Sequence, residues 1–101
     1  MERNIDPFLK RQLLIARDLS DEDFTNLKFL CQSFIPEGTL EDLSTPQKLF
    51  TELRHIGLLS DEKTETLASL LFHVGRSDLR NLLLGIEGNY VWQLTLRFQI
   101  V

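Results

Sequence analysis

The chain reads LSDEDFTNLKFLC from Leu19 to Cys31, and the spacing of its apolar residues predicts a helix. Ser20 is a favourable N-cap, and the acidic residues after it suit the positive end of a helix dipole. Apolar residues recur at steps of three and four, the period of an α-helix with one buried face. They are Phe24, Leu27, Cys31 and Phe34. We therefore expect a helix over residues 21–34, ended by the Pro-Glu-Gly sequence at residues 36–38.

Phe29 departs from this pattern. At about 100° per residue it lies about 140° from Phe24, on the side opposite the predicted buried face. Burying such a ring against a partner contributes roughly 1.5–3 kcal/mol, although single exposed hydrophobic residues are common in proteins. Leu30 stands beside Phe29 at the edge of the buried face, so the two residues are candidates for one interaction patch. Phe72 leaves its own helical face in the same way, and either a second contact or cover by a later segment explains it.

Similar patterns, punctuated by glycine and proline, predict further short helices. The first expected helix covers residues 7–18, with Asp6 as its cap and Pro7 in its first position, and a short one holds Leu40 and Leu43. The next runs from Thr45-Pro46 to Gly57, with one apolar face made of Leu49, Phe50, Leu53 and Ile56. The last two run from Ser60 to Gly75 and over residues 76–84. Leu9 and Leu13 belong to a broad apolar stripe in the first of them. The first 84 residues therefore predict an all-α bundle of five or six helices.

Residues 90–101 follow a different pattern. Every even-numbered residue from Tyr90 to Ile100 is apolar and the odd-numbered residues between Val91 and Val101 are polar, which is the alternation of a strand. The same residues also fit helical spacing. We expect one domain over residues 1–85 and a tail over residues 86–101. The tail is a strand that pairs between copies, a mobile segment, or a helix that begins a further domain of a longer protein.

Composition excludes several classes of protein. With 101 residues, 43% of them hydrophobic and 26% charged, the chain is expected to fold as one globular domain and not to be disordered. Eleven basic against fifteen acidic residues argue against nucleic-acid binding. No apolar run is long enough for a membrane span, and the start lacks the apolar core of a secretory signal. The lone Cys31 excludes an internal disulfide and suits a reducing compartment.

The sequence offers no arrangement of residues for catalysis or metal binding. Cys31 lies on the predicted apolar face, where a buried hydrophobic role is far more common than a nucleophilic one. His55 and His73 each stand near the end of a predicted helix, which favours positive charge. Two histidines and one cysteine without close spacing make no metal site, and no glycine-rich phosphate loop is present. We expect no enzyme, no metal and no cofactor.

The sequence Arg76-Ser77-Asp78-Leu79 opens the last predicted helix. If Asp23 lies nearby in the fold, the planar guanidinium of Arg76 can hold both Asp23 and Asp78. Exposed ion pairs of this kind contribute only about 0–1 kcal/mol each. We therefore expect their main use to be fixing charged side chains in place for a partner to recognise.

Two stretches resemble motifs of the death effector domain family. Residues 19–31 look like the second helix of these domains, and HVGRSDL at residues 73–79 looks like their RxDL motif. The resemblance covers about residues 6–84; some parts are similar to the adaptors of the family and others to the first domain of initiator caspase prodomains. It implies a six-helix antiparallel bundle of the death fold, a cytoplasmic location and no catalytic activity.

The resemblance also implies where partners bind. In the family, a hydrophobic patch on the second helix docks into a groove near the first and fourth helices of a neighbour. Carried over, the patch is Phe29 and Leu30, and Leu13 is a groove position. The residues of the family's charge triad fall on Asp23, Arg76 and Asp78.

Partners implied by the resemblance are other death effector domain proteins: adaptors, initiator procaspases and caspase-like inhibitors. Self-association is implied as well, through head-to-tail contacts that propagate into open assemblies. The expected function is a homotypic interaction module that assembles complexes of death-receptor adaptors and procaspases and so regulates apoptosis. The alternative is an inhibitory decoy that caps such assemblies and blocks caspase activation.

Overall fold

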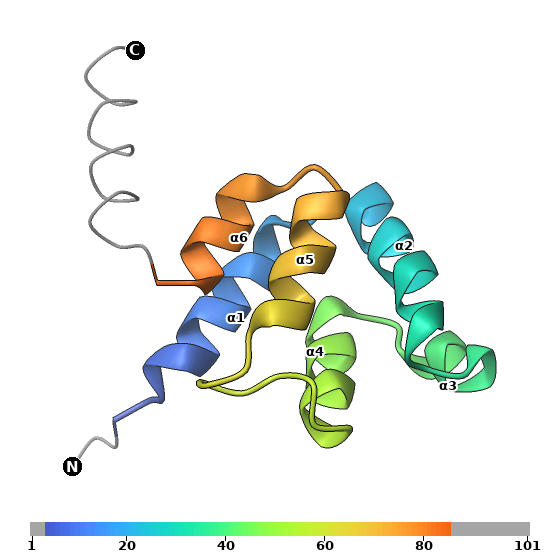
Figure 1. Ribbon diagram of the computed structural model, residues 1–101, viewed down its shortest axis with the longest axis horizontal. Helices are drawn as coiled ribbons and strands as arrows, with labels where there is room; N and C mark the ends of the chain where they lie inside the picture. Colours follow the sequence, from blue (N-terminus) through green and yellow to red (C-terminus); the bar gives the residue numbers. More distant parts are fainter. Residues whose placement is uncertain (1–3, 86–101) are drawn as a thin grey trace.

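Six α-helices build residues 4–85, the part of the chain that the computed structural model describes (Figure 1). They are α1 Pro7–Asp18, α2 Asp21–Leu30, α3 Glu37–Asp42, α4 Pro46–His55, α5 Glu65–His73 and α6 Ser77–Leu83. A 3₁₀ turn, η1 over Cys31–Ser33, follows α2 directly. Sheet pairing within residues 4–85 is limited to one isolated bridge between Ser60 and Lys63. The predicted all-α bundle is confirmed, with six helices.

Capping residues set the helix starts where the sequence places them. Asp6 accepts a hydrogen bond of 2.9 Å from the Phe8 N–H at the start of α1. At α2, Ser20 Oγ accepts from the Asp23 N–H at 3.0 Å while Asp23 Oδ2 accepts from the Ser20 N–H at 3.1 Å. This reciprocal pair is a capping box, which satisfies two N–H groups that the helix itself leaves without partners. Thr45 caps α4 in the simpler one-bond form.

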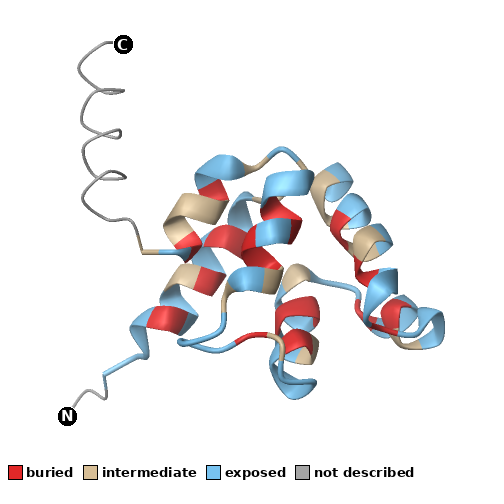
Figure 2. Ribbon diagram, in the orientation of Figure 1, coloured by how far each residue is buried: buried red, intermediate tan, exposed pale blue. Residues whose placement is uncertain are grey.

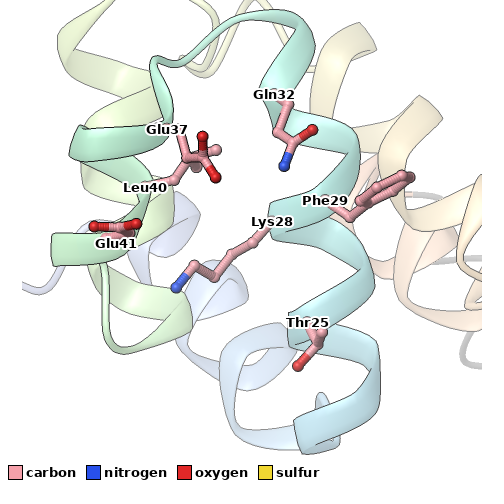
Figure 3. Close-up of a pocket in the computed structure, with 7 residues that line it drawn as sticks. All are labelled: Thr25, Lys28, Phe29, Gln32, Glu37, Leu40 and Glu41. Atoms are coloured by element: carbon pink, nitrogen blue, oxygen red, sulfur yellow. The ribbon is translucent and has the colours of Figure 1, made fainter.

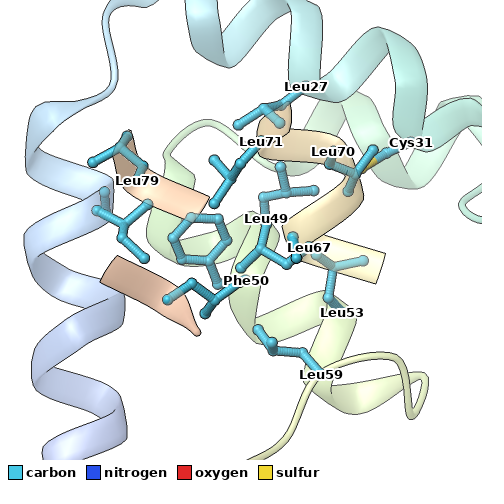
Figure 4. Close-up of a cluster of buried hydrophobic side chains, with 14 of the residues drawn as sticks. Leu27, Cys31, Leu49, Phe50, Leu53, Leu59, Leu67, Leu70, Leu71 and Leu79 are labelled. Atoms are coloured by element: carbon cyan, nitrogen blue, oxygen red, sulfur yellow. The ribbon is translucent and has the colours of Figure 1, made fainter. Parts of the chain in front are cut away.

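One hydrophobic core lies between the helices, and buried residues line the sides that face inward (Figure 2). Figure 4 shows Leu27 from α2, Phe50 from α4 and Leu71 from α5 pointing into the same cluster. α5 packs against α6 and α2, and α1 packs against α6 and α4. α2 therefore lies toward one edge of the bundle, on the side where α3 follows it (Figure 1).

The predicted burial of Phe34 is wrong: its side chain is 43% exposed, and Ile35 takes the core position at 2%. The cause is η1, because a 3₁₀ turn advances about 120° per residue where an α-helix advances about 100°. The buried face therefore shifts by one residue after Cys31. Ile56, predicted to lie on the buried face of the fourth helix, is also 40% exposed, since it follows α4 as its C-cap.

The predicted start of the fifth helix at Ser60 is wrong as well. Ser60 and Lys63 exchange two backbone hydrogen bonds of 3.0 Å and close a tight turn. The Lys63 carbonyl points back to Ser60 and so does not begin a helical ladder. α5 starts at Glu65 instead.

The tail predicted over residues 86–101, with its strand-like pattern, lies outside the described residues. The domain boundary at residue 85 stays a prediction. Within residues 4–85, no helix is both long enough and apolar enough to span a bilayer.

Two glycines with open space around them differ in backbone conformation. Gly75 has φ +83°, and Gly38 lies within α3. We expect Gly75→Ala to lower the free energy of unfolding by about 1–2 kcal/mol, since alanine is strained at positive φ. Gly38→Ala should raise it by about 0.5 kcal/mol through lower entropy of the unfolded chain. Urea unfolding measures both, and shifts of the same sign would contradict this assignment.

Candidate functional site

Phe29 projects into solvent from the outer face of α2. Its side chain is 66% exposed, more than any other large hydrophobic residue within residues 4–85, while Leu27 on the opposite face is fully buried. Figure 3 shows the ring pointing away from the side of α2 that carries Lys28 and faces α3. The predicted outward position of Phe29 is therefore confirmed. A ring so exposed is a natural anchor for a partner protein.

Leu30 contributes less to this surface than Phe29 does. It is half-buried and packs against the core. On the other side of α2, the Lys28 ammonium lies 5.3 Å from the centre of the Phe24 ring, a cation–π contact. The hydrophobic patch on α2 is thus the Phe29 ring with only an edge of Leu30 beside it.

A groove of about 210 Å³ runs between α1 and α4. Its lining residues are Leu9, Gln12, Leu13, Gln47, Phe50, Thr51 and Arg54. Leu9 and Leu13 stand in the predicted apolar stripe of the first helix, yet they are 40% and 44% exposed and border this groove. We call this feature the α1–α4 groove. It places Leu13, the groove position that the family resemblance implies, in an apolar hollow.

Sequence reasoning missed Gln12 in this groove. Gln12 is 5% exposed, so it belongs to the buried side of α1 although it is polar. The spacing of Gln12 is the sequence signal for its burial, because it follows Phe8 by four residues and precedes Ile15 by three.

A second groove, of about 250 Å³, lies between α2 and α3 (Figure 3).

Arg76 joins the starts of two helices to the end of a third. Its Nη1 lies 2.7 Å from Asp23 Oδ2, and its Nε and Nη2 donate to the two Asp78 carboxylate oxygens at 3.1 and 3.0 Å. The structure thus brings together the three residues of the implied charge triad. Asp18 is a fourth member that sequence reasoning missed: its carboxylate pairs with Nη2, and its carbonyl accepts from Nη1 at 3.1 Å. We call these four residues the Arg76 cluster.

The turn after α5 places Arg76 in this position. The Arg76 N–H donates to the Leu71 carbonyl at 2.8 Å and the Gly75 N–H to the Phe72 carbonyl at 3.0 Å. This is the Schellman pattern that ends a helix with glycine at positive φ. The chain therefore leaves α5 in a fixed direction, with the Arg76 side chain pointing at the junction of α1 and α2.

The contacts in the Arg76 cluster hold the Asp23 and Asp78 carboxylates in the charged form. Burial alone raises the pKa of Asp23, but hydrogen bonds from Ser20 and Arg76 outweigh it and hold that pKa below its ordinary value. For Asp78, the hydrogen bonds from Arg76 are the largest effect, and they lower its pKa against a smaller effect of burial. The Asp78 contact in turn raises the pKa of the Arg76 guanidinium. At neutral pH Asp23, Arg76 and Asp78 therefore carry their charges.

Cys31 belongs to the core, whereas Phe72 is exposed. Cys31 is fully buried, and burial raises the pKa of its thiol to about 11, which leaves it protonated and unreactive. Phe72 is 53% exposed, with the Arg80 guanidinium 5.5 Å from its ring centre and the His73 ring edge-on to it. No group of side chains suited to a metal ion exists among residues 4–85.

Comparison with known proteins finds one family. The family model described as Death effector domain matches residues 9–88. Caspase-8 from Mus musculus is 45% identical over 65 residues, which are 64% of this chain and 14% of that protein. FAS-associated death domain protein from Bos taurus is 40% identical over 75 residues, 74% of this chain and 36% of that protein. Caspase-10 from Homo sapiens is 36% identical over 72 residues, 71% and 14% of the two chains.

The matched regions thus make up a minor part of each of these three relatives. No solved structure matches the chain.

The Arg76 cluster predicts a pH-dependent contribution to stability. Arg76→Gln should lower the free energy of unfolding at pH 7 by about 1 kcal/mol, since the partners are partly exposed. The pKa values of Asp23 and Asp78 are lower in the folded chain than the ordinary 3.8. The cluster therefore contributes its full share of the free energy of unfolding when the pH is above the ordinary pKa. This contribution is lost as the pH falls through the folded values.

Urea unfolding of the parent and Arg76→Gln over a pH series measures this contribution. The difference between the two proteins should be constant from about pH 5 to 8 and shrink toward about pH 3. A difference that persists at acidic pH would show that Arg76 acts through packing and not through its charge.

Proposed function

The chain belongs to the death effector domain family, and from this we propose that its α2 patch docks into the α1–α4 groove of another such domain. Domains of this family are non-catalytic interaction modules, so the chemistry of any complex it enters belongs to its partners. The observation that carries the proposal is the exposure of Phe29 at 66% on a helix whose opposite face is buried through Leu27.

The shapes and chemistry of the two surfaces support this contact. The Phe29 ring is apolar, and the α1–α4 groove offers Leu9, Leu13 and Phe50 as apolar walls. Moving the ring from water into such a groove contributes roughly 1.5–3 kcal/mol. An anchor of that size, surrounded by weaker contacts, is the usual pattern of a protein interface.

The placement of the two surfaces makes the contact head-to-tail. α2 lies at one side of the bundle and α1 at the other, beside α6, with α5 in between (Figure 1). A copy that offers its patch to one neighbour still has its groove free for the next. Such contacts do not close into a dimer and can extend into open assemblies.

The Arg76 cluster has a supporting role in this proposal. By tying the start of α2 to α1 and α6, Arg76 holds the helix that carries Phe29 at a fixed angle to the bundle. Three carboxylates around one guanidinium also leave an excess of negative charge at the start of α2, the end of the helix opposite to Phe29. Asp23, Arg76 and Asp78 thus present a rigid charged rim that selects partners of complementary charge.

The relatives suggest the biological setting. One of them is by its name associated with FAS, and others are caspases. We infer that this chain links death-receptor adaptors to initiator procaspases in the cytoplasm, and that it does so by raising their local concentration. The other role open to such a module is a decoy that occupies these surfaces and ends the assembly.

The patch is tested by Phe29→Ala. This change should abolish self-association, measured by sedimentation velocity, and leave the helical content and melting temperature unchanged, because the ring is not part of the core. Phe34→Ala is the matched control: it removes a phenylalanine that is 43% exposed on another face, and association should persist.

A complementation experiment tests the groove as well. Leu13→Glu places a charge in the α1–α4 groove and should also prevent self-association. A mixture of Phe29→Ala and Leu13→Glu chains should form a one-to-one complex, because one copy keeps the groove and the other the patch. If the two variants stay monomeric together, patch and groove do not meet.

The recruiting role is tested in a purified mixture of a death-receptor adaptor and an initiator procaspase. Added parent chain should raise caspase activity, and added Phe29→Ala chain should leave it unchanged. A fall in activity with the parent chain would assign the decoy role instead.

A further inference from the structure

A buried amide without a partner lies in the α1–α4 groove. Gln12 is the one polar residue that is buried within residues 4–85, and its Nε2 is covered yet donates to no acceptor there. Buried polar groups in folded proteins are nearly always paired, because an unpaired donor costs free energy. Among the residues that line the groove are the apolar side chains of Leu9, Leu13 and Phe50. An isolated bundle has no evident use for an amide in this place.

We propose that Gln12 is a specificity-determining residue of the groove, and that its amide hydrogen-bonds to the Asn26 side chain of a second copy docked there. The inference rests on the proposed patch-to-groove contact and adds to it the polar group that the groove recognises. A helix that offered only apolar side chains would leave the amide unpaired and would be bound less well.

The exposed face of α2 carries the matching group. Glu22, Asn26 and Phe29 follow one another at steps of four and three residues, so they form one row along the helix. All three are exposed in the single bundle. A carboxamide such as that of Asn26 both donates and accepts, so it can pair with the amide of Gln12 in either orientation.

Charge complementarity sets the register of the docked helix. Arg54 lines the groove and donates only to Thr51 Oγ1, at 3.3 Å, with no carboxylate partner among residues 4–85. Glu22, at the start of the row on α2, likewise has no cationic partner in that part of the chain. Facing Glu22 toward Arg54 brings opposite charges together at one end of the contact.

The row on α2 and the α4 side of the groove have the same length. Phe29 follows Glu22 by seven positions, and Arg54 follows Gln47 along α4 by seven as well, about 10 Å each at the rise of an α-helix. With Glu22 at Arg54, the Asn26 side chain falls at the middle of the groove. Because the Gln12 nitrogen is covered in the free chain, pairing requires its amide to turn about the terminal side-chain torsion, which is a soft rotation.

A double-mutant cycle on the one-to-one complex of full-length chains tests this pairing. Gln12→Met is made in the Phe29→Ala copy, which supplies the groove, and Asn26→Ala in the Leu13→Glu copy, which supplies the patch. Calorimetry should show Kd raised about fivefold by either change. With both changes together, Kd should be no higher than with one, because the second removes a group already without its partner.

Two controls separate pairing from general effects. Gln32→Met removes another amide from the patch copy, in η1 beyond Phe29 and outside the row from Glu22 to Phe29, and its effect should multiply with that of Gln12→Met. Gln12→Met should leave the melting temperature of the free chain equal or higher, because methionine has a similar shape without the unpaired donor. A lower melting temperature with unchanged Kd would make Gln12 a core residue only and overturn the proposal.

The outcomes distinguish this inference from the proposed function. If Phe29→Ala and Leu13→Glu chains form their complex and the effects of Gln12→Met and Asn26→Ala multiply to about 25-fold, the groove binds the patch without the amide pair. If the two chains form no complex, the patch-to-groove contact itself is wrong, and the pairing fails with it.

Discussion

The guanidinium of Arg76 fixes the geometry on which the interaction surface depends. It bonds to the carbonyl at the end of α1, to Asp23 in the first turn of α2 and to Asp78 in the first turn of α6. The start of α2 is therefore held from both sides, while Leu27 and Cys31 bury its inner face. Once the helix is fixed at these points, its period leaves Phe29 no position except the solvent side. A charged contact and a hydrophobic one together determine where a single ring is displayed.

Local patterns of the sequence predict much of this arrangement. The start of α1 is predicted correctly because the cap Asp6 and the proline Pro7 after it are local signals. The outward position of Phe29 follows from helical period alone. The family resemblance, and not the residues themselves, supplies Leu13 and the charge triad as candidates.

The failures have physical causes that a single sequence does not display. A 3₁₀ turn after α2 shifts the buried face and exposes Phe34, and two backbone hydrogen bonds within residues 60–63 delay the start of α5. Asp18 joins Arg76 across 58 positions of sequence, so no local pattern connects them. Gln12 is buried although it is polar, and a pattern that equates polar with exposed assigns it to the surface.

Patch and groove lie on different sides of one small bundle, so in the proposed contact each chain provides the patch to one neighbour and the groove to another. Isotope-filtered NMR on the one-to-one complex tests this most directly. The Leu13→Glu chain supplies the patch, and the Phe29→Ala chain, which keeps Leu13, supplies the groove. The experiment should detect nuclear Overhauser effects between the Phe29 ring protons of the first chain and the methyl protons of Leu9 and Leu13 of the second. Effects from that ring to another face of the partner, or none at all, would contradict the account.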